Sequence, residues 1–180
     1  KEFLTDYSEK ELKYCINSAY DEKFDTKQIA PISKVGDDYV LELYHGPTCA
    51  FKDMALTIMP YLLKTAIEKN NLKEEVVILT ATSGDTGKAA LEGFKDVDKI
   101  KIVVFFPENG VSNIQKLQMK TTGGNNTCVV GINGNFDDAQ TGVKNIFADN
   151  NFNKDLKEKG YILSSANSIN IGRLTPQVVY

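Results

Sequence analysis

The sequence has few of the residues from which metal centres and disulfide frameworks are built. Its 180 residues include one histidine, His45, and three cysteines, Cys15, Cys49 and Cys128. No two cysteines have the close spacing of a zinc site, and an odd number of cysteines cannot all pair in disulfides. The sequence therefore predicts no metal centre, and it favours reduced thiols in a cytoplasmic protein.

Long apolar runs and dense clusters of one charge are also missing. No run is long enough to cross a bilayer, and no signal peptide is visible. The 21 basic and 24 acidic residues give a net charge of −3 without a dense basic block, so we expect neither nucleic acid nor a membrane among the partners. Hydrophobic residues make up 42% and charged residues 25%, a balance typical of a globular protein with a core.

Periodic patterns divide the chain into expected elements. A serine followed by acidic residues predicts a helix over about 8–20. Apolar runs at 76–79, 102–106 and 128–130 are typical of strands buried on both faces of a parallel sheet, and 39–44 and 161–163 are further expected strands. Helical spacing covers 53–69, 86–94, 111–120 and 137–149, with a last helix starting near Asn170. Pro60 predicts a kink in the first of these helices, or an earlier boundary.

The alternation of strands and helices predicts an α/β fold of three αβα layers with a mainly parallel open sheet. We expect an N-terminal helical segment over 1–35 and a small α/β domain over 36–165. Residues 166–180 then form the start of a continuation toward a further domain. Because residues 173–180 stop in the middle of an apolar pattern, we expect this chain to be part of a longer protein.

Three polar segments lie where ligands gather in an open parallel sheet, between the end of a strand and the start of a helix. The first, residues 45–53, reads His-Gly-Pro-Thr-Cys-Ala-Phe-Lys-Asp and places Lys52 at the start of an expected helix. The partly positive end of a helix disfavours a cation, and a depressed pKa is what a nucleophilic lysine needs. The alternative is a surface lysine paired with Asp53.

The other two segments suit anions. Residues 80–88 read Thr-Ala-Thr-Ser-Gly-Asp-Thr-Gly-Lys, and small residues with hydroxyls at a helix start can bind a carboxylate or a phosphate. A P-loop is excluded, because Thr82 stands where its first glycine belongs and Ala89 follows Lys88. Residues 164–173 combine hydroxyl and amide donors with Arg173, which suits a phosphate. Taken singly, each segment is also compatible with a capped turn.

Together the three segments resemble threonine synthase in order and spacing, from about Leu41 to the last residue. The resemblance implies a pyridoxal-phosphate enzyme that converts O-phospho-L-homoserine and water to L-threonine and phosphate. Lys52 would be the catalytic residue that carries the cofactor as a Schiff base, with Phe51 and Asp85 as further cofactor-binding residues. The substrate-binding residues that it implies are Ser83, Thr86, Asn167, Ser168 and Arg173.

The resemblance also implies that part of the site lies elsewhere. In this family, the glycine-rich loop for the cofactor phosphate and the partner of the pyridine nitrogen belong to a large domain downstream. We therefore expect the parent protein to be an enzyme and the 180-residue chain alone to be an inert domain without bound cofactor. A related lyase such as threonine dehydratase is the alternative, and the phosphate-binding group ending in Arg173 speaks against it.

Overall fold

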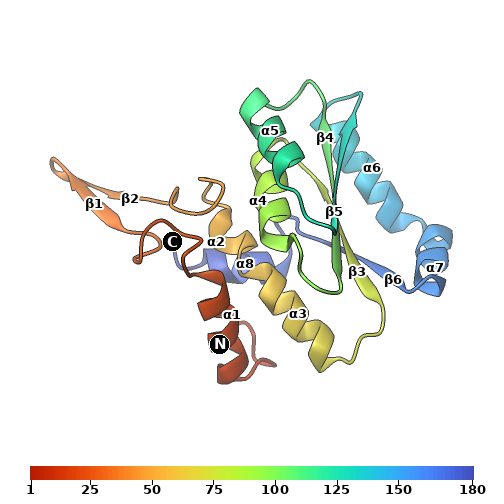
Figure 1. Ribbon diagram of the computed structural model, residues 1–180, viewed down its shortest axis with the longest axis horizontal. Coiled ribbons are helices and arrows are strands. Elements are labelled where there is room, and N and C mark those ends of the chain that lie inside the picture. Colours follow the sequence, from red (N-terminus) through yellow and green to blue (C-terminus); the bar gives the residue numbers. More distant parts are fainter.

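The computed structural model describes residues 1–180, and its centre is a sheet of four parallel strands. The strands lie in the order β5-β4-β3-β6. This order, with helices on both sides of the sheet (Figure 1), confirms the α/β fold and the parallel sheet that the sequence predicts. The bounds of the strands are β3 Glu75–Ala81, β4 Ile100–Pro107, β5 Thr127–Ile132 and β6 Tyr161–Ser165.

Two pairs of helices cover the sheet. α4 (Asp85–Phe94) and α5 (Asn113–Thr121) lie on one side, and α6 (Phe136–Ala148) lies on the other (Figure 1). The second helix on that other side, α7 (Asn150–Glu158), was not predicted. Its N-cap, Asp149, has an extended backbone and accepts a hydrogen bond from Phe152 N at 3.0 Å, so the chain ends α6 and starts a new helix there.

The hydrophobic core lies mainly on the α4 side of the sheet. In β4, Ile100, Ile102, Val104 and Phe106 are all at most 2% exposed and belong to one buried cluster with Phe94 of α4. Successive side chains of a strand point to opposite faces, and Lys101, Val103 and Phe105, which alternate with them, are only half-buried. β5 has no buried residue, because it is the edge strand of the sheet. The expectation that residues 128–130 are buried on both faces is therefore wrong.

An N-terminal helix packs outside the sheet. α1 (Glu9–Ala19) begins with a capping box between Ser8 and Glu11, as the sequence predicts. Its buried face joins α3 (Met59–Lys69) in a small cluster, and the hydroxyl of Tyr7 donates to the carbonyl of Leu62 at 2.7 Å. The N-terminal segment is thereby fixed against α3.

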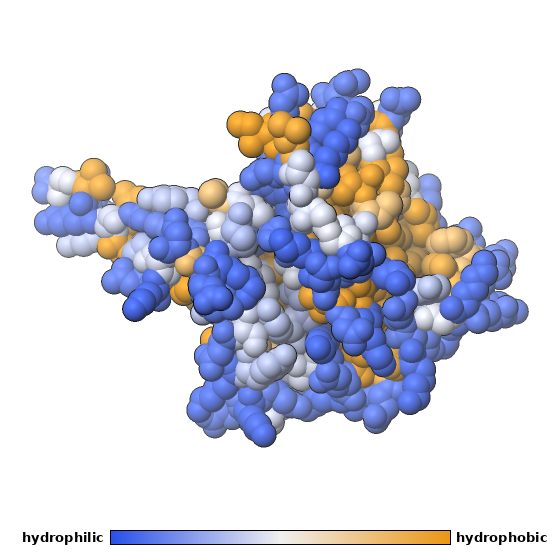
Figure 2. Space-filling model, viewed as in Figure 1, coloured by the Kyte–Doolittle hydropathy of each residue, from blue (hydrophilic) through white to orange (hydrophobic).

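The strand expected over 39–44 is wrong in its place and length. It is β2 (Asp38–Leu41), which pairs only with β1 (Ile32–Val35) in an antiparallel hairpin that projects from the rest of the molecule (Figure 1). Gly36, at φ +62°, makes the turn, and the expected boundary between 35 and 36 falls in this turn. Figure 2 shows apolar groups on the projecting hairpin, where Ile32 is 67% exposed.

The single helix expected over 53–69 is also wrong, because it is two helices. α2 (Asp53–Leu56) is short, and Pro60 lies in the first turn of α3. Proline has no N–H to donate, so it is better suited to a helix start than to a helix interior. α2 packs against α4 and against α8 (Ile171–Gln177). No helix of the structure has the length and apolar character that crossing a membrane requires.

Candidate functional site

A cavity of about 410 Å³ lies at the carboxyl ends of β3 and β6. The end of β3 contributes Thr80 and Ala81, and the end of β6 contributes Ser165. Six of the eight candidate residues from the sequence line it: Lys52, Ser83, Thr86, Asn167, Ser168 and Arg173. The fold thus brings the three polar segments together, at the edge of the sheet where a parallel arrangement places its ligands.

Lys52 precedes α2 and is half-buried at this cavity. Burial lowers its pKa, Asp85 opposes that effect, and the positive charges of Arg173 and Lys88 add to it. The lowered pKa agrees with the sequence-based expectation, but its main cause is burial. α2 has only four residues, and so short a helix carries little dipole at its N-terminus. A lowered pKa is one feature that a nucleophilic lysine needs.

The alternative interpretation of Lys52, as a surface lysine paired with Asp53, is wrong. Asp53 is 2% exposed. Its carboxylate accepts hydrogen bonds from the backbone N–H of Thr48 at 2.8 Å and from the Thr48 hydroxyl at 2.6 Å. Burial raises the pKa of Asp53 despite these bonds. Asp53 thus fixes the shape of its own segment, and Lys52 lies over the ring of Phe51, with Nζ 5.6 Å from the ring centroid.

The second segment forms the tight turn that opens α4. The hydroxyl oxygen of Thr82 accepts hydrogen bonds from the N–H groups of Gly84 at 2.9 Å and Gly87 at 2.8 Å. Gly84 has φ +140°, a backbone conformation that glycine adopts without a steric penalty. This turn directs Ser83 and Thr86 into the cavity. Its two bonds account for the local geometry, and the side chains that it presents remain free to bind a ligand.

Phe51 and Asp85 are not among the residues that line the cavity. Phe51 is 44% exposed. Asp85 accepts a hydrogen bond from Gln115 Nε2 at 2.9 Å and lies 3.4 Å from Lys88 Nζ. Burial alone would raise the pKa of Asp85, but the bond from Gln115 and the charges of Lys88 and Lys52 outweigh burial and lower it. Asp85 is therefore a carboxylate that acts on Lys52 through its charge.

Arg173 is a buried cation whose hydrogen bonds are incomplete. It is 5% exposed, and its Nη1 donates to the carbonyl of Ala166 at 2.9 Å. Its Nε is buried without any partner, and burial lowers the pKa of the guanidinium. An unpaired charge in a protein interior is costly. An anion in the cavity, which Arg173 lines, would supply the opposite charge.

The family described as "Pyridoxal-phosphate dependent enzyme" matches residues 32–173. The chain belongs to this family. The match includes all three polar segments and the whole of the parallel sheet. The cofactor of the family is the one that the sequence led us to expect.

The chain is similar to proteins described as threonine synthase or as threonine synthase-like. "Threonine synthase-like 1" of Homo sapiens is 48% identical over 172 residues, which are 92% of this chain and 23% of the relative. Threonine synthase of Pseudomonas aeruginosa is 46% identical over 153 residues, which are 84% of this chain and 31% of the relative. The solved structure of pyridoxal-phosphate-bound threonine synthase from Brucella melitensis has a TM-score of 0.83 at 38% identity. The matched region is 95% of this chain and 35% of the chain in that structure.

These relatives confirm the resemblance to threonine synthase that the three segments indicate. The chain spans 23% to 34% of the length of the relatives that it matches. For a pyridoxal-phosphate dependent enzyme, the cavity supplies the amine, Lys52, and donors for a second anion. No glycine lines it, so the residues of this chain fit the lysine end of the cofactor, and they do not form a glycine-rich cradle for its phosphate.

The sequence does not predict one wall of the cavity, which α6 forms. α6 contributes Phe136, Gln140, Val143, Lys144 and Phe147. Lys144 Nζ donates to Gln140 Oε1 at 3.0 Å. The spacing of these five residues is that of an ordinary amphipathic helix. It does not predict that the polar ones face the end of β3. No group of three or more His, Cys, Asp or Glu side chains is placed to hold a metal ion.

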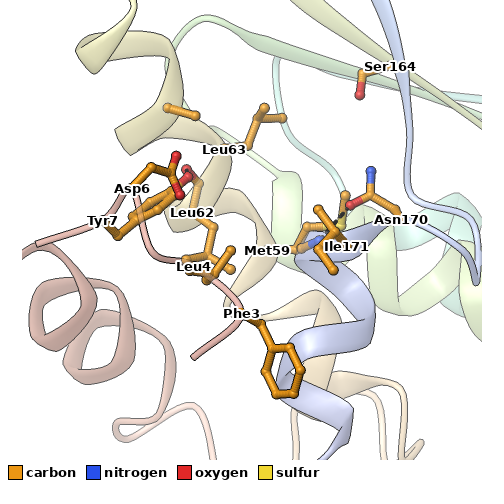
Figure 3. A pocket seen from close by; sticks show the side chains of 12 residues that line it. Phe3, Leu4, Asp6, Tyr7, Met59, Leu62, Leu63, Ser164, Asn170 and Ile171 are labelled. Atoms are coloured by element: carbon orange, nitrogen blue, oxygen red, sulfur yellow. Dashed lines mark hydrogen bonds between the residues drawn. The ribbon is translucent and has the colours of Figure 1, made fainter. Parts of the chain in front are cut away.

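A second pocket, of about 320 Å³, lies beside the start of α8 and differs in chemistry (Figure 3). Phe3 and Leu4 of the N-terminal segment meet Met59 and Leu62 of α3 there. Ser164 lines this pocket, whereas the next residue of β6, Ser165, lines the cavity of Lys52. Its mostly apolar wall offers no amine and no arginine, so we assign the candidate site to the cavity of Lys52.

Proposed function

We propose that this chain is the lysine-bearing part of a threonine synthase, in which Lys52 is the catalytic residue that holds pyridoxal phosphate. The single observation that supports this most is the shared cavity. A half-buried lysine with a lowered pKa opens into the same space as a buried arginine with an unpartnered Nε. An amine for a carbonyl cofactor and a cation for a phosphate substrate are the two groups that this reaction needs.

The reaction that we propose converts O-phospho-L-homoserine and water to L-threonine and phosphate. Pyridoxal phosphate, when bound, supplies an electron sink for the α-carbon of the substrate. Lys52 binds the cofactor, is released by the substrate amine, and then moves protons at the α and β carbons. Its lowered pKa supports this role, because it raises the fraction of unprotonated amine, which can accept a proton.

The two anionic ends of the substrate bind to different walls of the cavity. Ser83 and Thr86 stand at the start of α4, where hydroxyls and backbone N–H groups suit the substrate carboxylate. Asn167, Ser168 and Arg173 lie after β6 and suit its phosphate. We propose that Asp85 and Phe51 flank the cofactor, with Asp85 acting through its charge on Lys52.

We propose that residues outside this chain complete the site, in a large domain of the same protein. The share of the relatives that the chain covers supports this, as does the lack of glycine in the cavity wall. The 180-residue chain alone is then inactive. The division at residues 35 and 165 and the cytoplasmic location stay predictions.

Assays of the full-length protein and of the 180-residue chain, side by side, test the proposal. We expect the full-length protein to absorb visible light as a cofactor-loaded enzyme does, and to release phosphate and L-threonine from O-phospho-L-homoserine. Lys52→Ala should abolish both properties. Lys13→Ala, which removes an exposed lysine of α1, should leave them unchanged.

Replacing Arg173 tests separately whether this residue binds the phosphate of the substrate. Arg173→Leu should raise the KM for O-phospho-L-homoserine while the cofactor absorbance stays. Full turnover by Lys52→Ala would refute the role of Lys52. Formation of 2-oxobutanoate from L-threonine, without phosphate release from O-phospho-L-homoserine, would identify a dehydratase instead.

A further inference from the structure

Lys88 is the only buried lysine of the protein. It is 8% exposed and lies in the first turn of α4. That turn is the partly positive end of a helix of ten residues, which disfavours a cation. Lysine is rarely buried unless it has partners. Its position therefore calls for groups that compensate both the burial and the helix end.

Two groups compensate Lys88, and they belong to two different polar segments. Its Nζ donates to the carbonyl of Thr48 at 3.2 Å and lies 3.4 Å from Asp85 Oδ1. Thr48 is in turn bound through its N–H and hydroxyl to Asp53. Lys88 thus links the segment that carries Lys52 to the start of α4. Its bond to Thr48 is buried, whereas Asp85 is only partly buried.

Lys88 also contributes to the electrostatic environment of Lys52. The charged groups that act on Lys52 are Asp85 and Lys88 from α4 and Arg173 from α8. Asp53, the acid next to Lys52 in the chain, is bound to Thr48. Asp85 is then the only carboxylate that favours a protonated Lys52, and Lys88 lies against that carboxylate. Without Lys88, Arg173 alone would oppose the charge of Asp85 on Lys52.

We propose that Lys88 is a positioning residue of the Lys52 site, which holds the Thr48 carbonyl and the Asp85 carboxylate so that Lys52 keeps its place and Asp85 is turned toward a competing cation. The proposal rests on the proposed role of Lys52 as the cofactor-binding amine. It adds a residue that touches neither cofactor nor substrate, since Lys88 is not among the residues that line the cavity.

Competitive labelling of the cofactor-free, full-length protein with acetic anhydride tests this proposal. The extent of acetylation at Lys52 is measured by mass spectrometry against pH, with exposed Lys13 in the same sample as the internal reference. Lys88→Met should move the labelling midpoint of Lys52 to higher pH. A shift of one pH unit would lower labelling below the midpoint about tenfold. Lys88→Arg keeps the cation and should stay close to the wild type.

Asp85→Asn provides the opposite perturbation. It removes the carboxylate that favours protonated Lys52, so the midpoint should move to lower pH. The double variant Lys88→Met with Asp85→Asn should lie below Lys88→Met alone. If Lys88→Met fails to fold, by circular dichroism, then Asp85→Asn and Lys88→Arg decide the question. An unshifted Lys52 midpoint in folded Lys88→Met, or in Asp85→Asn, would overturn the proposal.

The proposed function has separate readouts in the same protein. Protection of Lys52 from acetylation by added pyridoxal phosphate, and phosphate release from O-phospho-L-homoserine, report on it. If the wild type shows neither while Lys88→Met shifts the midpoint, the proposed function fails and the positioning role of Lys88 holds. If both are present and the midpoint does not move, the positioning role fails alone.

Discussion

Replacing Gly93 by alanine tests how closely α4 approaches α2. A Cβ atom at Gly93 would lie 2.1 Å from the carbonyl oxygen of Leu56, far inside van der Waals contact. That oxygen belongs to the backbone at the end of α2, so no flexible side chain can move away. Because Leu56 N also donates to the Lys52 carbonyl at 2.9 Å, a displaced Leu56 would disturb the segment of Lys52.

The magnitude follows from two opposing terms. Adding a methyl group to a well-packed interior costs about 1–3 kcal/mol of stability. Because the methyl group of Gly93→Ala would meet backbone, we expect a cost at the upper end, about 3 kcal/mol. Alanine is favoured over glycine in a helix interior by about 1 kcal/mol, which leaves a net loss of about 2 kcal/mol. For a chain of this size, each kcal/mol lowers the Tm by about 2–4 °C. We therefore expect Gly93→Ala to melt about 4–8 °C lower.

Gly142 in α6 is a matched control, since a Cβ there meets nothing within 4 Å. Gly142→Ala should be more stable than the wild type by about 1 kcal/mol, because alanine favours the helix and meets no neighbour there. Urea and thermal unfolding, followed by circular dichroism, measure both variants, and the acetylation of Lys52 shows whether the disturbance reaches it. Equal stability of Gly93→Ala and wild type, or a larger loss in Gly142→Ala, would refute the packing of α2 against α4.

Two further predictions concern parts that surround the site. His45 lies between Glu42 Oε2 at 2.6 Å and Asp25 Oδ1 at 2.5 Å, and these two hydrogen bonds raise its pKa. A raised pKa stabilises the folded state fully below the unfolded value of about 6.5, and this stabilisation is lost as the pH rises through the folded pKa. The difference in unfolding midpoint between wild type and His45→Gln should therefore be larger at pH 6 than at pH 9, and a constant difference would contradict the ion pairs. The side chain of Asn135 caps α6, so Asn135→Ala should lower the free energy of unfolding in urea by about 1 kcal/mol. Asn145 is exposed in the interior of the same helix, so Asn145→Ala should lower it by nothing. Equal losses in both variants would show that the cap contributes nothing.

Local signals in the sequence predict the central fold well. The apolar runs at 76–79 and 102–106 lie within β3 and β4, whose pairing partners on both sides keep them buried or half-buried. The same kind of run at 128–130 predicts a strand correctly but not its exposure. Edge position depends on which strand lies next to which, and no local pattern records that order. The strand expected over 39–44 differs from β2 for a similar reason, because β2 pairs with β1, where the sequence predicts no strand.

The candidate site divides in a similar way. Short motifs identify Lys52, Ser83 and Arg173, because each lies in a polar segment beside an expected strand or helix. The wall from α6 and the burial of Lys88 depend on packing across the sheet and between helices, and helical spacing alone does not predict either. The sequence predicts a lowered pKa at Lys52 from the helix N-terminus, whereas its largest cause in the structure is burial. A helix end is visible in the sequence, whereas burial is not.

The position of Lys52 therefore depends on residues that do not line the cavity. α2, which follows Lys52, has four residues and no capping side chain, and so short a helix is not stable by itself. Its position comes from packing against α4 and α8, from the space that Gly93 leaves for Leu56, and from the bonds that Asp53 and Lys88 make to Thr48. If that is so, substitutions in α4 that lower stability should also change the acetylation midpoint of Lys52. Substitutions of equal cost in the first two turns of α1 should lower stability alone, because these turns pack against α3. They leave in place Tyr20, the C-cap of α1, whose hydroxyl donates to the Met54 carbonyl of α2 at 2.6 Å.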